Sequence, residues 1–158
     1  MPMESRSWLL PALCSLAFLC SCPPGAARAE EARYVGTAAC AGCHPTQHAA
    51  FVKHSKKAHA SDNVRLMVKK LSPEELAGCF ACHVTGYGKP GGFTSFEATP
   101  GLADAGCEVC HGPGSIHAAS GDPAAIKGKL AVADCQDCHN ESRVRAFGYK
   151  PLLQAGAH

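Results

Sequence analysis

Two cysteines and a histidine recur four times in the chain with one spacing, Cys-x-x-Cys-His. The four copies are Cys40, Cys43 and His44; Cys79, Cys82 and His83; Cys107, Cys110 and His111; and Cys135, Cys138 and His139. Two thiols at this spacing can form thioether bonds to the vinyl groups of one porphyrin, and the adjacent histidine can ligate its iron. The repetition therefore predicts four covalently bound haem c groups with iron.

The cysteine count supports this interpretation over others. Of 11 cysteines, Cys14, Cys20 and Cys22 lie in an apolar N-terminal stretch, and the motifs use the remaining eight. Four disulfides, or zinc sites built from paired Cys-x-x-Cys units, are the alternatives. Neither explains a histidine after every second cysteine. A thioredoxin-like motif is expected once, near a βαβ pattern that this sequence lacks.

Residues 1–29 have the features of a cleaved export signal. Arg6 precedes an apolar run from Trp8 to Leu19, and Ala27-Arg28-Ala29 matches a small-x-small cleavage site. The run is short for a membrane-spanning helix. Leu19-Cys20-Ser21-Cys22 also resembles a lipobox, so a lipid anchor is an alternative. We expect a mature chain of residues 30–158 in the periplasm, without a transmembrane segment; an outer-membrane lipoprotein or an extracellular protein is the other option.

The mature chain is short for four cofactors. Its 129 residues leave about 32 residues per haem, too few to enclose each haem in its own pocket. We therefore expect a mainly α fold with sparse secondary structure, a compact multihaem cytochrome domain built around four stacked covalent haems.

Periodicity and capping signals place the elements. A helix is expected over 45–60, with His48 and His59 on one face and His54 off it, and a second over 62–70. Ser72-Pro73-Glu74-Glu75 is typical of a capped helix start leading into the second motif. Phe93 to Phe96 suggests a short strand or hairpin, and Asp122-Pro123 a further helix start; residues 143–158 are expected to be mostly irregular.

Each iron needs a sixth ligand unless its site is open. Five histidines lie outside the motifs, and Met67 is the single methionine after residue 29. At most one haem can therefore have His/Met ligation, and most should be bis-histidine with low potentials. His54 shares a lysine-rich patch with Lys53, Lys56 and Lys57, which favours a solvated side chain. The candidates are His48, His54, His59, His117 and His158.

Nearly all of the mature chain resembles the tetrahaem cytochrome c-554 family. The resemblance covers Tyr34-Val35-Gly36, Lys57-Ala58-His59-Ala60, the stretch Cys82 to Gly88 with Gly91-Gly92-Phe93, and Gly106 to His117, where Cys110-His111-Gly112-Pro113-Gly114 is the most specific part. It implies haems stacked in pairs, the first with the third and the second with the fourth, acting as an electron relay. It also implies that His117 is the distal ligand of the first haem and His59 that of the fourth.

Three features differ from the family or stay open. Phe51 stands where the family usually has tryptophan, and the chain ends 19 residues after His139. The family's longer C-terminal helix, which brings a ligand to the third haem, is missing, which leaves His158 as the candidate there. The resemblance implies a five-coordinate second haem; if that site is closed, His48 is a better candidate than His54.

Two functional classes follow. We expect a non-catalytic electron carrier that exchanges electrons with redox partner proteins, its donor and acceptor being unspecified by the sequence. The alternative is a small enzyme that reduces a nitrogen oxide at an open haem on the second motif. The net charge of +2 gives no support for nucleic-acid binding.

Overall fold

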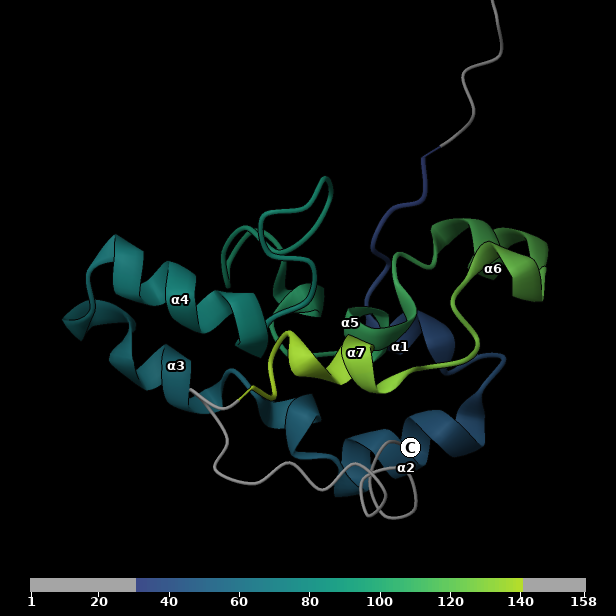
Figure 1. The fold of residues 1–158 in the computed structure, drawn as a ribbon, viewed down its shortest axis with the longest axis horizontal. Coiled ribbons are helices and arrows are strands. Elements are labelled where there is room, and N and C mark those ends of the chain that lie inside the picture. The colour runs from purple at the N-terminus through teal and green to yellow at the C-terminus, as the bar shows by residue number, and fades with distance from the viewer. Residues whose placement is uncertain (1–30, 141–158) are drawn as a thin grey trace, which may run out of the picture. The chain divides into compact units, whose positions relative to one another are not determined.

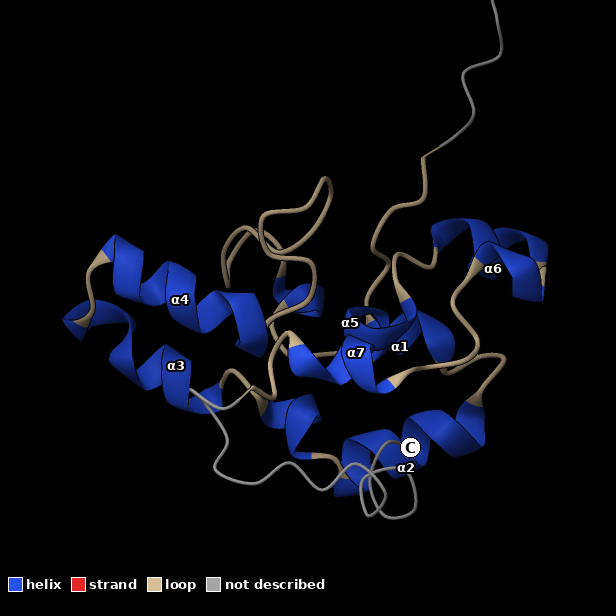
Figure 2. Cartoon of the chain, viewed as in Figure 1, coloured by secondary structure: helices blue, strands red, loops and turns tan. Residues whose placement is uncertain are grey.

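A computed structural model describes residues 31–140, which fold as short helices joined by turns and loops (Figure 1). These residues contain no β-strand (Figure 2), so the predicted class, mainly α with sparse secondary structure, is confirmed. The elements are α1 (Thr37–Cys40), α2 (Pro45–His54), η1 (Lys56–His59), α3 (Asp62–Met67), η2 (Val68–Lys70), α4 (Pro73–His83), η3 (Pro100–Leu102), α5 (Cys107–His111), α6 (Ser115–Ser120), η4 (Pro123–Ala125) and α7 (Val132–Gln136).

The single helix predicted for residues 45–60 is wrong, because the chain breaks at Ser55. The backbone of Ser55 is extended, and its hydroxyl accepts a hydrogen bond from Lys57 N at 3.3 Å. A serine side chain that bonds the nearby backbone competes with the helical pattern and favours a cap. Helix α2 therefore ends at His54 and the 3-10 turn η1 begins at Lys56, so His48 and His59 do not share one continuous helix face.

The helices expected over 62–70 and after Ser72 are both present. Residues 62–70 form α3 followed by η2. At the start of α4 the Ser72 hydroxyl accepts from Glu75 N at 3.3 Å, and the Glu75 carboxylate accepts from Ser72 N at 2.8 Å, which confirms the capping box. Helices α3 and α4 lie in contact (Figure 1), and α4 carries the second motif in its last turns.

Two other local predictions differ from the structure. Instead of a strand, Phe93 to Phe96 leads into a turn in which the Ser95 hydroxyl accepts from Ala98 N at 3.0 Å. Asp122 caps only the short 3-10 turn η4, where its carboxylate accepts from Ala124 N at 2.8 Å. Residues 143–158 lie outside the described part of the chain.

The apolar core of the described residues is small. Val84, Phe93, Leu102 and Ala103 are buried together, and Phe80, Phe96 and Tyr34 pack against them. The Phe80 ring lies 5.1 Å from Phe93 and 5.7 Å from Phe96, in tilted and edge-on arrangements. Because Phe80 lies between Cys79 and Cys82, this cluster fixes one face of α4. Within residues 31–140 no helix is long and apolar enough to cross a membrane.

A close backbone contact between Gly86 and Gly92 closes the loop that precedes the core residue Phe93. A Cβ on Gly92 would lie 1.8 Å from the carbonyl oxygen of Gly86, whereas a Cβ on Gly128 meets nothing within 4 Å. We expect Gly92→Ala to lower the free energy of unfolding by about 1–3 kcal/mol, because a backbone atom cannot yield as a flexible side chain can. Gly128→Ala is the matched control and should be neutral or slightly stabilising. Chemical denaturation of both variants checks this; equal stability of the two would contradict it.

Candidate functional site

Each Cys-x-x-Cys-His motif lies in or beside a short helix. Helix α1 ends at Cys40, α4 ends at His83, α5 spans Cys107–His111 and α7 contains Cys135. Residues three and four positions apart lie on the same side of a helical turn. In helices such as α4 and α5, the two thiols and the imidazole of one motif can therefore face one planar group.

The motifs lie together in pairs that are distant in the sequence. The Cys40 and Cys107 thiols are hydrogen-bonded, and burial together with this neighbour raises the pKa of Cys40 to about 11. The Cys138 and Cys82 thiols are likewise hydrogen-bonded, and burial is again the larger cause that raises the pKa of Cys138 to about 12. The first motif thus lies beside the third, and the second beside the fourth.

A third contact joins the two pairs. Cys110 of the third motif lies near Cys135 of the fourth, and burial raises the pKa of Cys110. Lys127 bridges the same motifs: its backbone N donates to His111 O at 3.1 Å, its carbonyl accepts from His111 Nδ1 at 2.6 Å, and its ammonium forms an ion pair with Asp134 in α7. The contacts therefore run in the order first, third, fourth, second motif.

No disulfide joins any two of the eight motif cysteines in the described residues. A thiolate, not a thiol, is the nucleophile and the zinc ligand. The raised pKa values of Cys40, Cys110 and Cys138 keep these three thiols protonated at neutral pH. The raised pKa values disfavour a reactive dithiol at these positions.

His44 is the last residue of the first motif and His117 lies in α6, and their rings are neighbours. Their ring centroids are 6.1 Å apart and their planes differ by 24°. Two imidazoles on opposite sides of one metal ion, each bonded through nitrogen at about 2 Å, place their ring centroids roughly 6 Å apart. The pair therefore lies at a spacing at which both imidazoles could ligate one haem iron.

Backbone carbonyls orient the imidazoles of several candidate ligands. His83 Nδ1 donates to Ala60 O at 2.5 Å, His111 Nδ1 to Lys127 O at 2.6 Å, and His117 Nδ1 to Asp122 O at 2.8 Å. A histidine whose proton lies on Nδ1 has an unprotonated Nε2, which is the form of a ring nitrogen that can bind a metal. Histidines of this kind are a common feature of metal centres.

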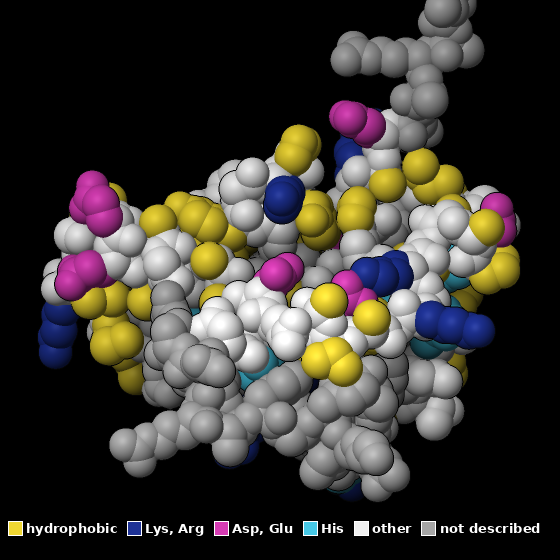
Figure 3. All heavy atoms as spheres, viewed as in Figure 1, with side chains coloured by type: hydrophobic (Ala, Val, Ile, Leu, Met, Phe, Trp, Pro, Cys, Tyr) yellow, Lys and Arg dark blue, Asp and Glu magenta, His cyan; other side chains and the backbone are white. Residues whose placement is uncertain are grey.

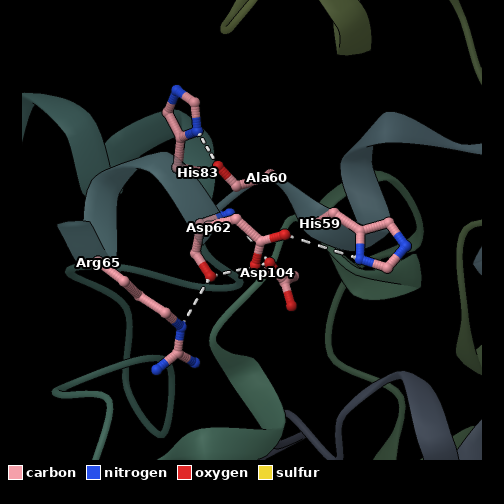
Figure 4. Close-up of polar contacts among 7 residues, drawn as sticks. His59, Ala60, Asp62, Arg65, His83 and Asp104 are labelled. Carbon is pink, nitrogen blue, oxygen red and sulfur yellow. Dashed lines mark hydrogen bonds and ion pairs between the residues drawn. The ribbon is translucent and has the colours of Figure 1, made fainter.

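A polar network fixes the segment that contains both Ala60 and His59 (Figure 4). Ser61 is fully buried, and its N and hydroxyl both donate to Asp104 Oδ1 at 2.9 Å. His59 projects from this network toward Asp62, with 3.9 Å between Nδ1 and Oδ2, whereas the His83 ring lies over Ala60. Asp104 in turn stands just before the third motif.

The turn η1 lies near the fourth motif, because the charge of its residue Lys57 acts on His139. Burial lowers the pKa of His139, and the charge of Lys57 lowers it further, so the imidazole stays in the neutral form that binds metals. Lys57 also acts on Cys110. His59 is exposed and belongs to the same turn, η1, as Lys57.

The remaining predicted ligands have different surroundings. His48 lines a cavity of about 200 Å³ with Phe51 and with residues next to the first and third motifs, Thr37, Ala38 and Gly106 among them. No residue of the second motif lines that cavity. His54 is exposed, and Met67 is 41% exposed. His158 lies outside the described residues.

Glu108 is a site residue that the sequence analysis missed. It lies between Cys107 and Cys110 with only 3% of its surface exposed. Its carboxylate accepts hydrogen bonds from Val35 N, Gly36 N and Gly114 N at 2.7–3.1 Å. The one available signal was an acidic residue inside an attachment motif. Its hydrogen-bond partners could not be read from the sequence, because Val35 and Gly36 are more than 70 residues away and Gly114 lies across a glycine turn.

Taken together, the residues present fit covalent haem. The thiols of each pair of motifs lie in contact, three imidazoles have Nδ1 bonded to backbone carbonyls, and His44 and His117 lie at a separation at which both could ligate one iron. The apolar core of the described residues is also small enough to need the apolar surface of a large cofactor.

Comparison with known families places these motifs in context. A family model, cytochrome c554 and c-prime, matches residues 39–112, a stretch that holds the first three motifs. Searches of curated proteins and of solved structures gave no match. The match supports a c-type cytochrome that carries electrons on covalently bound haem. Over residues 39–112, the chain is similar to the cytochrome c554 and c-prime family.

Proposed function

We propose that the mature chain relays electrons in the periplasm through four covalently bound, mostly bis-histidine haems. The observation that carries this proposal is the set of contacts between motifs, which brings all four into one continuous cluster. When bound, haem iron supplies a one-electron ferric/ferrous couple. The chain's own residues attach, orient and space these centres.

The contacts support a linear order of centres. Cys40 lies beside Cys107, Cys110 beside Cys135, and Cys138 beside Cys82. Electrons entering at one end therefore pass the first, third, fourth and second motifs in turn, or the reverse. The two ends of this order, the first and second motifs, are the places where partners exchange electrons most directly.

Axial histidines set the potentials of the centres. A Nδ1 hydrogen bond to a backbone carbonyl raises the basicity of Nε2, which stabilises the ferric state. We assign His44 and His117 to the first centre because their rings face each other at 6.1 Å. We assign His59 to the fourth because Lys57, in the same turn, acts on His139.

Redox partner proteins remain the expected partners. On the face shown in Figure 3, acidic and basic side chains are interspersed with hydrophobic ones. Such a mixed surface favours brief docking with more than one partner over tight binding to a strongly charged one.

The second prediction concerns stoichiometry. Protein produced with a haem-maturation system should gain the mass of four haems, because the four motifs use all eight cysteines beyond residue 29. Intact-mass spectrometry measures this, and acid-acetone should fail to extract the haem. A gain of any other number would contradict the proposal.

The third prediction concerns His117. Replacing His117 with Ala should convert one haem to the high-spin state, because His117 faces His44 at ligand spacing and lies outside every attachment motif. Low-temperature EPR measures the change, and mass spectrometry should still find four haems. His54→Ala is the control, because His54 is exposed, and its spectrum should match the parent. An unchanged spectrum for the His117 variant would refute the assignment.

A second candidate function is nitrogen-oxide reduction at the second motif. It is favoured by the surroundings of His48, whose cavity contains residues beside the first and third motifs and none of the second. A second centre without a distal ligand can bind a small molecule. The carrier nevertheless remains the proposal, since binding of a small molecule at an open centre is not by itself catalysis.

Nitric oxide separates the two candidates. If the second centre is closed, titrating the reduced protein with nitric oxide should give no rapid nitrosyl EPR signal. Rapid formation on one haem in four would show an open centre, and steady consumption of nitric oxide with a reductant would then establish the enzyme. The His117→Ala variant serves as a positive control for an opened iron.

A further inference from the structure

Glu108 has an unusual environment for a carboxylate. It is almost completely buried, and among the described residues no lysine, arginine or histidine forms an ion pair with it. Its four hydrogen bonds all come from backbone N–H groups: Oε1 accepts from Val35 and Gly114, and Oε2 from Val35 and Gly36. An ionised carboxylate only accepts hydrogen bonds, so every one of these contacts suits the charged form.

The environment explains how a buried charge is tolerated. Burial of an unpaired charge is costly, but hydrogen bonds from N–H groups to a carboxylate are among the stronger ones and offset much of that cost. Backbone donors carry no net charge. The negative charge of Glu108 is therefore solvated by the protein without being neutralised.

This charge reaches the first motif as well as the third. Glu108 lies between Cys107 and Cys110, and its charge contributes to raising the pKa of the Cys40 thiol, after burial and the Cys107 thiol. It also adds to the effect of burial in raising the pKa of Tyr34. The carboxylate is thus electrostatically coupled to the two motifs that lie in contact.

We propose that Glu108 is a fixed negative charge that lowers the midpoint potentials of the centres attached to the first and third motifs. The inference rests on the proposed function, because it requires haem at those motifs. One-electron reduction of a ferric centre removes one positive charge, with no proton or bond change. A buried negative charge nearby stabilises the ferric state and disfavours that step.

The test compares two charge-removing variants of the holoprotein. Glu108→Gln keeps the side-chain shape and one acceptor oxygen but loses the charge. Glu97→Gln is the matched control, because Glu97 is exposed on the loop after the core aromatics. Potentials are measured by spectroelectrochemistry with an electrode as the electron donor.

We expect Glu108→Gln to raise at least one of the four midpoint potentials by about 59 mV, which is a tenfold change in the equilibrium constant of a one-electron reduction. Glu97→Gln should leave all four unchanged. Midpoints of Glu108→Gln that equal those of Glu97→Gln, in a protein with four low-spin haems, would overturn the proposal. Failure to find four haems in the parent protein would instead overturn the proposed function.

A measurement on the parent holoprotein applies if Glu108→Gln loses haem or low-spin character. Infrared difference spectra between oxidised and reduced protein, recorded with and without ¹³C-labelled glutamate, detect carboxylates perturbed by reduction. A labelled band of an ionised carboxylate supports the proposal. The absence of such a band, or a labelled band of a protonated carboxyl, overturns it.

Discussion

The buried carboxylate of Glu108 joins three segments on which the arrangement of motifs depends. It holds the backbone of Val35 and Gly36, which leads into α1 and the first motif, and that of Gly114, which leads into α6 and His117. Glu108 itself belongs to the third motif. One side chain therefore sets the position of His117 relative to His44. Two imidazoles cannot be held at a fixed separation unless both supporting segments are fixed, and this carboxylate contacts both segments.

Close backbone approach completes the contact between the first and third motifs. Thr37 Oγ1 accepts from Cys107 N at 3.2 Å, and Thr85 Oγ1 accepts from Gly106 N at 3.0 Å. A Cβ at Gly106 would lie only 2.2 Å from Thr37 Oγ1, so this approach needs glycine. Hydroxyl groups and a glycine thus achieve what apolar packing does in larger domains. With so few buried apolar side chains, polar contacts between backbone segments must define the positions of the motifs.

Sequence patterns revealed the features whose causes are local. The attachment motifs are read directly because covalent chemistry needs two thiols and a histidine at a fixed spacing, and the Ser72 capping box depends on residues three apart. The break at Ser55 was missed because apolar periodicity does not report competition between a hydroxyl and the helix. The burial of Glu108 and the approach of His117 to His44 depend on contacts between segments some 70 residues apart. No local pattern encodes such contacts, and the family resemblance supplied the second of them only as an expectation.

The peptide segment 59–61 shows how neighbouring motifs can be connected without a dedicated linker. His59 belongs to the turn beside the fourth motif, while the carbonyl of the next residue, Ala60, orients His83 of the second. Ser61 anchors both through Asp104, just ahead of the third motif. A shift of this segment would therefore move the His59 side chain and the carbonyl that orients His83 at once. Lys127 repeats the principle between the third and fourth motifs, because its backbone orients His111 while its side chain pairs with Asp134 of α7. Short segments that contact two motifs explain how a chain with so little regular structure can hold four motifs at defined relative positions.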